Sequence, residues 1–296
     1  MKIGFTFTNY NNSRLSIQAA HSIAAHHGDC EYQIVLVDNA STEDERRILA
    51  EPGALPPDCT VLWSPKNVGY FDGLNLGITA LWDNSTHYDA IVIGNNDLVF
   101  ESSFFEGMRR RTEAFARHSV VSPDIITLDH EHQNPHVISS VSRFREIIWD
   151  LYFSSFWLSQ LIGWFARLAR SLVGRKDHQA HAHEGPISQG YGACYILTPR
   201  FFQNYRLLWS PGFLMGEEFY LARQLASHGE QMYYVPDIPV QHHDHATVSK
   251  LPSKRLWEMT RQYHHIYRFF VSPYRITMDN GKMAADFDRR MQAKST

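Results

Sequence analysis

The sequence has few cysteines and almost no net charge, and both shortages exclude classes of protein. Its three cysteines are far apart and odd in number, so they make neither a disulfide framework nor a metal-ligand spacing. This favours reduced thiols in a cytosolic compartment. The 28 Lys and Arg residues nearly balance the 31 Asp and Glu residues, which leaves a net charge of −3. Such a chain has no electrostatic footprint for nucleic acid, and we expect no nucleic-acid partner.

Long hydrophobic runs and internal repeats are also missing. The N-terminus passes directly into a strand-like alternation, without the apolar stretch and cleavage site of a secretory signal, so we expect a cytoplasmic protein. The longest uncharged run, residues 151–166, is shorter than the roughly 20 residues that cross a bilayer. The 296 residues, 44% of them hydrophobic, suffice for one large α/β domain or two small ones.

What the sequence does contain is an alternation of short apolar strands and helical patterns in its first hundred residues. This alternation predicts a Rossmann-like, mostly parallel central sheet flanked by helices. We expect strands at 3–8, 32–37, 60–63 and 90–93, and helices at 13–27, from 41 onward and at 72–82. Beyond them we expect a helix at 101–118, an irregular stretch to 143, strands at 190–197, 233–235 and 238–241, a helix at 217–228, and a C-terminal helix with a loose tail.

Polar residues follow three of the expected strands, at the sheet edge where open α/β folds bind their ligands. They fall in the segments 38–41, 67–77 and 95–97. Asn95, Asn96 and Asp97 carry oxygen atoms that suit Mg²⁺ or Mn²⁺. Clusters of Asn and Asp are also common turn formers, so these three residues alone leave both interpretations open.

In their order along the chain, these segments resemble the motifs of the family 2 glycosyltransferases with the GT-A fold. The similarity is greatest to bacterial rhamnosyltransferase-like and polysaccharide-assembly members, and it continues through 192–194, 216–218 and 240–242. The resemblance implies a GT-A domain over residues 1–250, whose first hundred residues form the nucleotide-sugar-binding half. Residues 251–296 would then be the C-terminal helix and tail.

The resemblance also implies roles for individual residues. Asp38 would contact the nucleotide base, and Asp97 would ligate a divalent metal with His242 completing the coordination. The other expected donor-site residues are Asn67, Gly69, Gly73, Asn75, Asn95 and Asn96. Glycines there let the backbone approach a ligand, and the helix N-terminus beside them offers N–H groups to an anion. The sequence departs from the family's Asp-x-Asp pattern, because only Asp97 is anionic, which predicts modest metal affinity.

Glu217 and Glu218 match the family's acidic pair, whose second member is the general base. By this resemblance Glu218 takes the proton of the acceptor hydroxyl, and Glu217 orients the acceptor. The two roles could also be exchanged. The alternative is that two acidic residues in a first helical turn only favour the helix dipole.

Seventeen histidines are an unusual total for a chain of this length. Most are expected near helix C-termini or in solvated loops. His242 aligns with the late histidine of the family, which binds metal or diphosphate. A separate zinc site among His178, His181 and His183 is an alternative, although no cysteine or carboxylate completes a tetrahedral set.

Residues 144–176 form an aromatic and basic block. Three tryptophans, Trp149, Trp157 and Trp164, stand among several arginines. This composition predicts an amphipathic helical insertion that lies in the interface of an anionic membrane, on its inner face. A buried helix or a contact between copies of the chain is the alternative.

Together these features predict an inverting, metal-dependent glycosyltransferase. It would use Mn²⁺ or Mg²⁺ and move a hexosyl or rhamnosyl unit from a nucleotide-diphosphate sugar to a saccharide or lipid-linked acceptor in cell-surface polysaccharide synthesis. Two other functions remain open. One is a sugar-phosphate nucleotidyltransferase, although its usual N-terminal Gly-rich loop is missing, and the other is a non-catalytic sugar-nucleotide or membrane-binding module.

Overall fold

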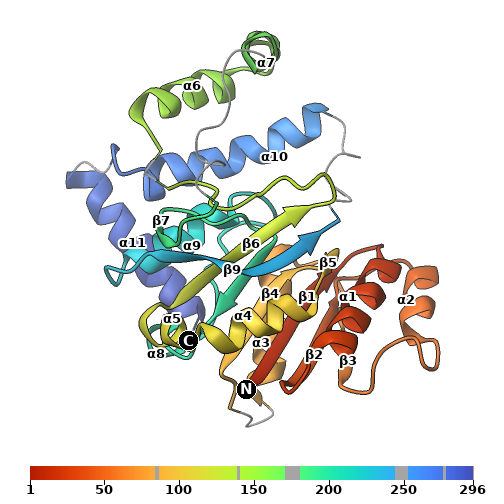
Figure 1. Cartoon of the computed structure of the whole chain (residues 1–296). Coiled ribbons are helices and arrows are strands. Elements are labelled where there is room, and N and C mark those ends of the chain that lie inside the picture. Colours follow the sequence, from red (N-terminus) through yellow and green to blue (C-terminus); the bar gives the residue numbers. More distant parts are fainter. Residues whose placement is uncertain (84–86, 139–140, 171–180, 244–252, 276–277, 296) are drawn as a thin grey trace.

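A mixed sheet forms the centre of the computed structural model, which describes residues 1–83, 87–138, 141–170, 181–243, 253–275 and 278–295 (Figure 1). Within these residues the sheet has nine strands in the order β3-β2-β1-β4-β8-β6-β9-β5, and β7 pairs with β9. The first four strands in this order, β3, β2, β1 and β4, are parallel to one another, as expected for βαβ units. The predicted α/β class and mostly parallel, helix-flanked sheet are therefore confirmed.

The N-terminal half follows the predicted alternation closely. Its elements are β1 (Lys2–Asn9), α1 (Ser13–His26), β2 (Glu31–Asp38), α2 (Glu43–Ala50), β3 (Cys59–Trp63), α3 (Tyr70–Asp83) and β4 (Ala90–Asn95). Helix α3 begins earlier than the predicted residue 72, because the Tyr70 N–H is hydrogen-bonded by the distant Phe213 carbonyl at 3.0 Å. A cap from so far along the chain leaves no local sequence signal.

The second half of the sheet is mixed, and here the structure differs from the prediction. Its strands are β5 (Leu98–Val99), β6 (Val120–Thr127), β7 (Gly185–Ile187), β8 (Cys194–Leu197) and β9 (Met232–His242). Strand β6 occupies part of the stretch expected to be irregular. The two short strands predicted around Pro236 are one strand, because the pairing with β6 shifts from Pro123↔Val235 to Asp124↔Pro239 and leaves the intervening residues without β6 partners.

The helices around this half are α4 (Ser102–Arg110), α5 (Thr112–Arg117), α8 (Phe201–Asn204) and α9 (Glu217–Ala226). The single helix predicted at 101–118 is divided, since Arg111 has non-helical dihedral angles between α4 and α5. The predicted helix at 217–228 is confirmed with a slightly earlier end.

An outer layer of helices packs over the C-terminal half of the sheet (Figure 1). It contains α6 (Arg143–Ser154), α7 (Phe156–Arg170), α10 (Ser253–Ile266), a π-helical turn (Tyr267–Val271) and α11 (Met278–Ser295). The aromatic block is thus two helices, broken at the extended residue Ser155, and its residues 171–176 lie outside the described part. The expected loose tail is instead the helix α11, which a bidentate ion pair between Arg223 and Asp288 ties to α9. In the described ranges, no helix has both the length and the apolarity to cross a membrane.

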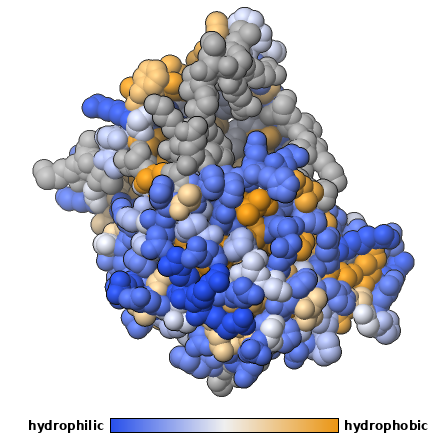
Figure 2. All heavy atoms as spheres, viewed as in Figure 1, coloured by the Kyte–Doolittle hydropathy of each residue, from blue (hydrophilic) through white to orange (hydrophobic). Residues whose placement is uncertain are grey.

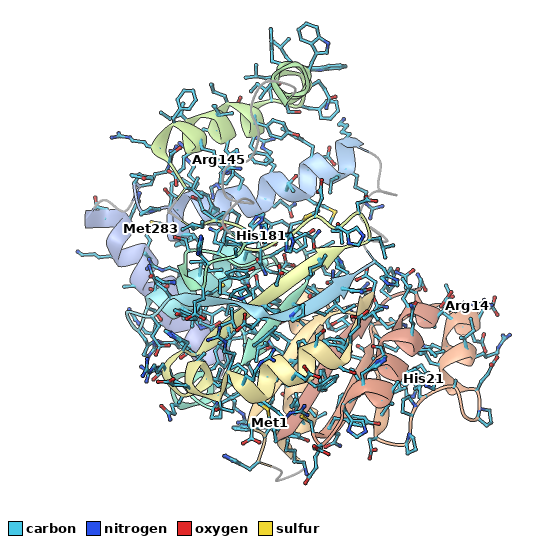
Figure 3. All side chains as sticks on the ribbon, in the orientation of Figure 1. Met1, Arg14, His21, Arg145, His181 and Met283 are labelled. Carbon is cyan, nitrogen blue, oxygen red and sulfur yellow. The ribbon has the colours of Figure 1, made fainter. Side chains whose placement is uncertain are left out.

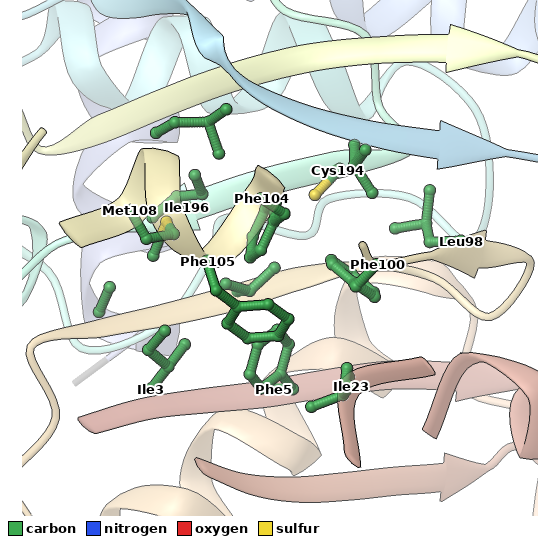
Figure 4. Close-up of a cluster of buried hydrophobic side chains, with 14 of the residues drawn as sticks. Ile3, Phe5, Ile23, Leu98, Phe100, Phe104, Phe105, Met108, Cys194 and Ile196 are labelled. Carbon is green, nitrogen blue, oxygen red and sulfur yellow. The ribbon is translucent and has the colours of Figure 1, made fainter. Parts of the chain in front are cut away.

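Alternating side chains of the central strands fill a core on each face of the sheet. Ile34 and Leu36 of β2 belong to one cluster, which contains the aromatic side chains of Phe5, Phe104 and Phe105 (Figure 4). Their neighbours on the same strand point into the other cluster, against α3 and α9. Because both faces are buried, β2 reads as a nearly continuous apolar run. The apolar runs stop where these strands leave the core, and polar residues stand at the strand ends.

Candidate active site

Asp38, at the end of β2, is fully buried and held by internal partners. Its Oδ1 lies 2.6 Å from Nε of Arg46, and its Oδ2 accepts a hydrogen bond from Nδ2 of Asn9 at 3.1 Å. The Arg46 guanidinium also donates to the Ser64 carbonyl at 2.6 Å. Asp38 therefore fixes Arg46 and the neighbouring strand ends. Its predicted contact with a nucleotide base is a separate role, which these internal contacts leave untested.

The loop before α3 is shaped by the side chains of Asn39 and Asn67. Asn39 donates from Nδ2 to the Gly69 carbonyl at 2.9 Å and accepts from the Val68 N–H at 2.8 Å. Asn67 Oδ1 accepts from the Gly69 N–H at 3.0 Å. Gly69 has a positive φ of 97°, and a Cβ atom there would lie 2.1 Å from the Phe213 carbonyl oxygen. Only glycine fits this close approach of two backbone segments.

We predict that Gly69→Ala destabilises the fold more than Gly53→Ala does. Both glycines have positive φ, but a Cβ atom at Gly53 would meet nothing within 4 Å. Gly53→Ala should therefore cost only the backbone strain of about 1–3 kcal/mol, whereas Gly69→Ala adds the clash with Phe213. Urea unfolding of the two variants measures the difference in unfolding free energy. Equal losses of unfolding free energy in the two variants would show that the backbone at Phe213 moves aside without loss of stability.

Gly73 and Asn75, which were expected in the donor pocket, pack α3 against its neighbours. A Cβ atom at Gly73 would lie 2.9 Å from the Thr8 side chain of β1. The Asn75 amide exchanges hydrogen bonds of 2.9 Å with the Leu208 backbone in both directions. These contacts give both residues a structural role, and the donor-site role expected for them stays a prediction.

The turn after β4 separates the three residues of the 95–97 segment. Asn96 points inward, where its Nδ2 donates to Ser16 Oγ at 2.8 Å and so ties the turn to α1. Asp97 faces the opposite way, toward His242 of β9. Pairing of Leu98 with His242 in the sheet brings these two residues together from positions far apart in the sequence. Of the segment, Asn95 and Asp97 thus share a site with His242, and Asn96 does not.

His242 has the geometry of a metal ligand. Its Nδ1 lies 2.8 Å from Gln133 Oε1, and since that amide oxygen can only accept, Nδ1 carries the hydrogen. In the neutral imidazole, the lone pair of Nε2 then lies 3.2 Å from Asp97 Oδ1 and 3.4 Å from Asn95 Nδ2. Two ligands of one metal ion, each about 2.1 Å from it at a right angle, lie about 3 Å apart. The spacing of Asp97 and His242 therefore fits a shared divalent cation.

The residues that the structure describes do not complete such a site by themselves. Among the described residues, no group of three or more His, Cys, Asp or Glu side chains is placed to hold a metal. A cation on Asp97 and His242 needs further oxygen ligands, and Mg²⁺ is commonly bound by one or two carboxylates together with substrate phosphates. The arrangement suits a cation that binds with a phosphorylated ligand.

The alternative zinc cluster is not assembled in the described ranges. His178 lies outside them, as does His245. The His181 ring stacks on His132 at 3.8 Å, beside the sheet and beneath α10, and His132 is in turn paired with Asp124 (Figure 3).

Glu217 and Glu218 begin α9 beside the backbone of Gly192. Met215 and Gly216 both have positive φ, and this sharp turn places the pair at the start of the helix. Glu217 Oε1 accepts the Met215 N–H at 2.9 Å. Glu218 is hydrogen-bonded by the Gly192 backbone, and a Cβ atom at Gly192 would lie 2.8 Å from its Oε1.

Burial raises the pKa of both carboxyl groups above the ordinary value. The charge of Glu218 adds to burial and raises the pKa of Glu217 to about 8. The pair therefore retains one proton near neutral pH. The pKa of Tyr70 is raised by burial and then by the negative charges of Glu217, Asp97 and Glu218. Asp97 and the two glutamates therefore lie around one tyrosine, Tyr70.

This proton makes stability depend on pH in a defined direction. The pKa of Glu217 is higher in the folded protein than the ordinary 4.5, so its contribution to stability is present below pH 4.5 and is lost as pH rises through about 8. Glu217→Gln cannot ionise at this position. We predict that the Tm of this variant, relative to the Tm of the wild type, is about 5 °C higher at pH 9 than at pH 5. Thermal unfolding at both pH values measures this gain. A Tm difference that does not change with pH would contradict the raised pKa.

Several residues that shape the site escaped the sequence analysis. Arg46, Gln133 and Tyr70 act through contacts with partners distant in sequence, the last by donating from its hydroxyl to the Gly192 carbonyl at 2.9 Å. Asn39 had a local signal, because it directly follows Asp38 at a strand end. Gln133 had none, since its role depends on the parallel pairing of β6 with β9.

Comparison with known proteins identifies the family and supports the fold. The family model described as glycosyl transferase family 2 matches residues 8–156. Among solved structures, the crystal structure of GalNAc-T7 with UDP, GalNAc and Mn²⁺ resembles the model with a TM-score of 0.51 and 12% sequence identity. The match covers 98% of this chain and 54% of that one, so this chain spans about half the length of its structural neighbour. No curated protein matches the sequence.

Proposed function

The chain belongs to glycosyl transferase family 2, and we propose that it is an inverting, metal-dependent glycosyltransferase. It moves a hexosyl or rhamnosyl unit from a nucleotide-diphosphate sugar to an acceptor hydroxyl. One observation carries this proposal. A pair that suits a cation, Asp97 and His242, and the carboxyl pair of Glu217 and Glu218 both lie near Tyr70, whose pKa is raised by burial and then by Asp97 and both glutamates.

The donor half of the proposed site lies at the carboxyl ends of β2 and β4. Asp97 Oδ1 and His242 Nε2 would hold Mn²⁺ or Mg²⁺, and the donor diphosphate would supply the remaining oxygen ligands. When bound, the cation supplies positive charge that stabilises the leaving diphosphate. The loop at Asn67 and Gly69, fixed by Asn39, borders the nucleotide, and Asp38 acts on the base directly or through Arg46. The Mn²⁺ and UDP of the structural neighbour are consistent with this assignment.

The acceptor half is built around Glu218. Its ionised carboxylate takes the proton of the acceptor hydroxyl while that oxygen bonds to the anomeric carbon. In the same step the bond from that carbon to the diphosphate oxygen breaks, and attack from the opposite side inverts the configuration. Glu217 keeps its proton and orients the acceptor. The Gly192 backbone, itself held by Tyr70, fixes Glu218 for this role.

We propose that the acceptor is a lipid-linked or growing saccharide used in cell-surface polysaccharide synthesis at the inner face of a membrane. Helices α6 and α7 expose large apolar side chains, among them Phe144 at 73% and Trp157 at 80%. Figure 2 shows hydrophobic residues gathered at the top of the molecule, where α6 lies in Figure 1. Arg145 lies on the same helix as Phe144, which adds positive charge for anionic lipid (Figure 3). Co-sedimentation with anionic but not neutral vesicles is expected, and binding to neither would overturn the membrane assignment.

Release of nucleotide diphosphate tests the proposed reaction. A panel of nucleotide sugars is incubated with the protein, with and without Mn²⁺ and with and without a saccharide acceptor. Release that depends on both metal and acceptor is expected. Pyrophosphate formed from a nucleoside triphosphate and a sugar phosphate would instead identify a nucleotidyltransferase. Donor binding without any release would identify a non-catalytic module.

A further inference from the structure

An aromatic cavity of about 330 Å³ lies between α6, α9, α10 and the π-helical turn. Trp149 and Phe153 of α6 form one wall, and Phe219 of α9 lines another. Met215 and Gly216, which also line it, immediately precede Glu217. The volume lies at the lower end of the range for small-molecule sites. The cavity is therefore next to the carboxyl pair that would meet the acceptor.

The cavity has little capacity to hydrogen-bond a sugar. None of its lining residues is Asp, Glu, Lys or Arg. Burial and the nearby Arg268 lower the pKa of His264 to about 4, so its imidazole is neutral. Four of the polar lining side chains already have partners within the protein. Thr260 Oγ1 donates to the Leu256 carbonyl at 2.6 Å, and the Tyr263 hydroxyl accepts from the Phe213 and Leu214 N–H groups at 3.0 Å. His264 Nε2 lies 3.0 Å from Asp150, and the Tyr267 hydroxyl donates to Glu146 at 2.7 Å.

Tyr220 differs from these four residues. Its side chain is buried, with 3% of the residue exposed, and its hydroxyl has no hydrogen-bond partner among the described residues. A buried hydroxyl without a partner is costly, so a ligand oxygen that accepts from it would be favoured. The hydroxyl lies 3.5 Å from the Cβ position of Gly216, at the end of the cavity nearest Glu217. An occupant that matches this lining is mostly hydrocarbon, with an oxygen at the end that faces the carboxyl pair.

Helix α6 connects this cavity to an exposed apolar surface. Phe144, Ile147 and Leu151 on the same helix are 48–73% exposed, and α7 continues the surface with Trp157 and Leu161. A hydrocarbon chain that leaves the cavity along α6 thus remains in an apolar environment. We propose that the cavity binds the hydrocarbon segment of an amphiphilic, lipid-linked acceptor and thereby places its hydroxyl at Glu218. This inference rests on the proposed glycosyl transfer.

Two glucosides that differ only in their alkyl group test the cavity without requiring catalysis. Isothermal titration should show that n-octyl β-D-glucoside, used below its micellar concentration, binds at least roughly 30-fold more tightly than methyl β-D-glucoside. Phe153→Asn should weaken octyl glucoside binding at least 10-fold, because it places an amide in the apolar wall. Leu128→Asn makes the same kind of change at an exposed leucine outside α6 and the cavity, and should alter the affinity less than 2-fold.

Thr260→Leu provides a second variant that fills the cavity instead of making it polar. It should also abolish the preference for the octyl chain without lowering Tm by more than a few degrees, so the test survives if Phe153→Asn fails to fold. Equal affinities for the two glucosides, or equal losses of affinity in Phe153→Asn and Leu128→Asn, would overturn the proposal. Acceptor-dependent nucleotide release that is equally fast with both glucosides would overturn the role of the cavity but would support the proposed glycosyl transfer. Octyl binding in the cavity without any sugar transfer would overturn the proposed function instead.

Discussion

We expect Glu218→Gln to lower acceptor-dependent turnover at least about 100-fold, because the variant keeps the shape of the side chain but cannot accept the hydroxyl proton. Donor binding should remain nearly unchanged, since Glu218 lies on the acceptor side of the site and contacts the Gly192 backbone. Steady-state release of nucleotide diphosphate measures the first effect. A thermal-shift titration with the donor measures the second.

Glu217→Gln is the matched control at the adjacent position. Because the raised pKa of about 8 keeps Glu217 mostly protonated at pH 7, glutamine resembles the form already present. Turnover should therefore fall no more than about 10-fold at pH 7. Near-normal turnover in Glu218→Gln, or a larger loss in Glu217→Gln than in Glu218→Gln, would transfer the role of base to Glu217.

The second large effect is expected for Asp97→Asn. This substitution removes the carboxylate that faces His242 Nε2 and with it the negative charge of the proposed cation pair. Turnover at saturating donor should fall by about 100-fold or more, and the Mn²⁺ concentration for half-maximal activity should rise. Activity measured over a Mn²⁺ titration separates these two effects. The thermal shift produced by Mn²⁺ together with UDP should also decrease.

Two further substitutions make the metal prediction specific. Asn95→Asp adds a carboxylate near His242, where Asn95 Nδ2 now lies 3.4 Å from Nε2, and should lower the Mn²⁺ concentration needed for half-maximal activity. Asp129→Asn makes the same charge change as Asp97→Asn, but on an exposed loop, and should have no effect on turnover or on the Mn²⁺ dependence. If Asp97→Asn keeps the metal dependence of the wild type, Asp97 is not a ligand.

The N-terminal half of the fold was predictable because its signals are local. Strands β1, β2 and β4 are apolar runs that end at polar residues, and each lies within a residue or two of its expected bounds. The second half depends on pairings between distant segments. Strand β6 was missed, and β9 was divided at Pro236, because the shift in pairing that accommodates the proline is a property of two strands together.

The same distinction applies to the candidate site. The order of the motifs predicted a metal site shared by Asp97 and His242, and the sheet places Asp97 Oδ1 and His242 Nε2 3.2 Å apart. Motif order also put Gly73 and Asn75 in the donor pocket, and the structure shows that both residues also pack α3 against neighbouring segments. A motif records that a residue type recurs at a position. It does not separate residues that touch a ligand from residues that hold the backbone around it.

The backbone at Phe213 connects the two substrates of the proposed reaction. Its carbonyl caps α3 next to the donor loop, its N–H is held by Tyr263 at the wall of the aromatic cavity, and Glu217 follows a few residues later. A donor that orders the loop at Gly69 therefore also restrains the segment that carries the carboxyl pair. By thermodynamic reciprocity, an acceptor that restrains this segment tightens donor binding by the same factor. Cooperative binding of the two substrates would then reside in one short stretch of main chain.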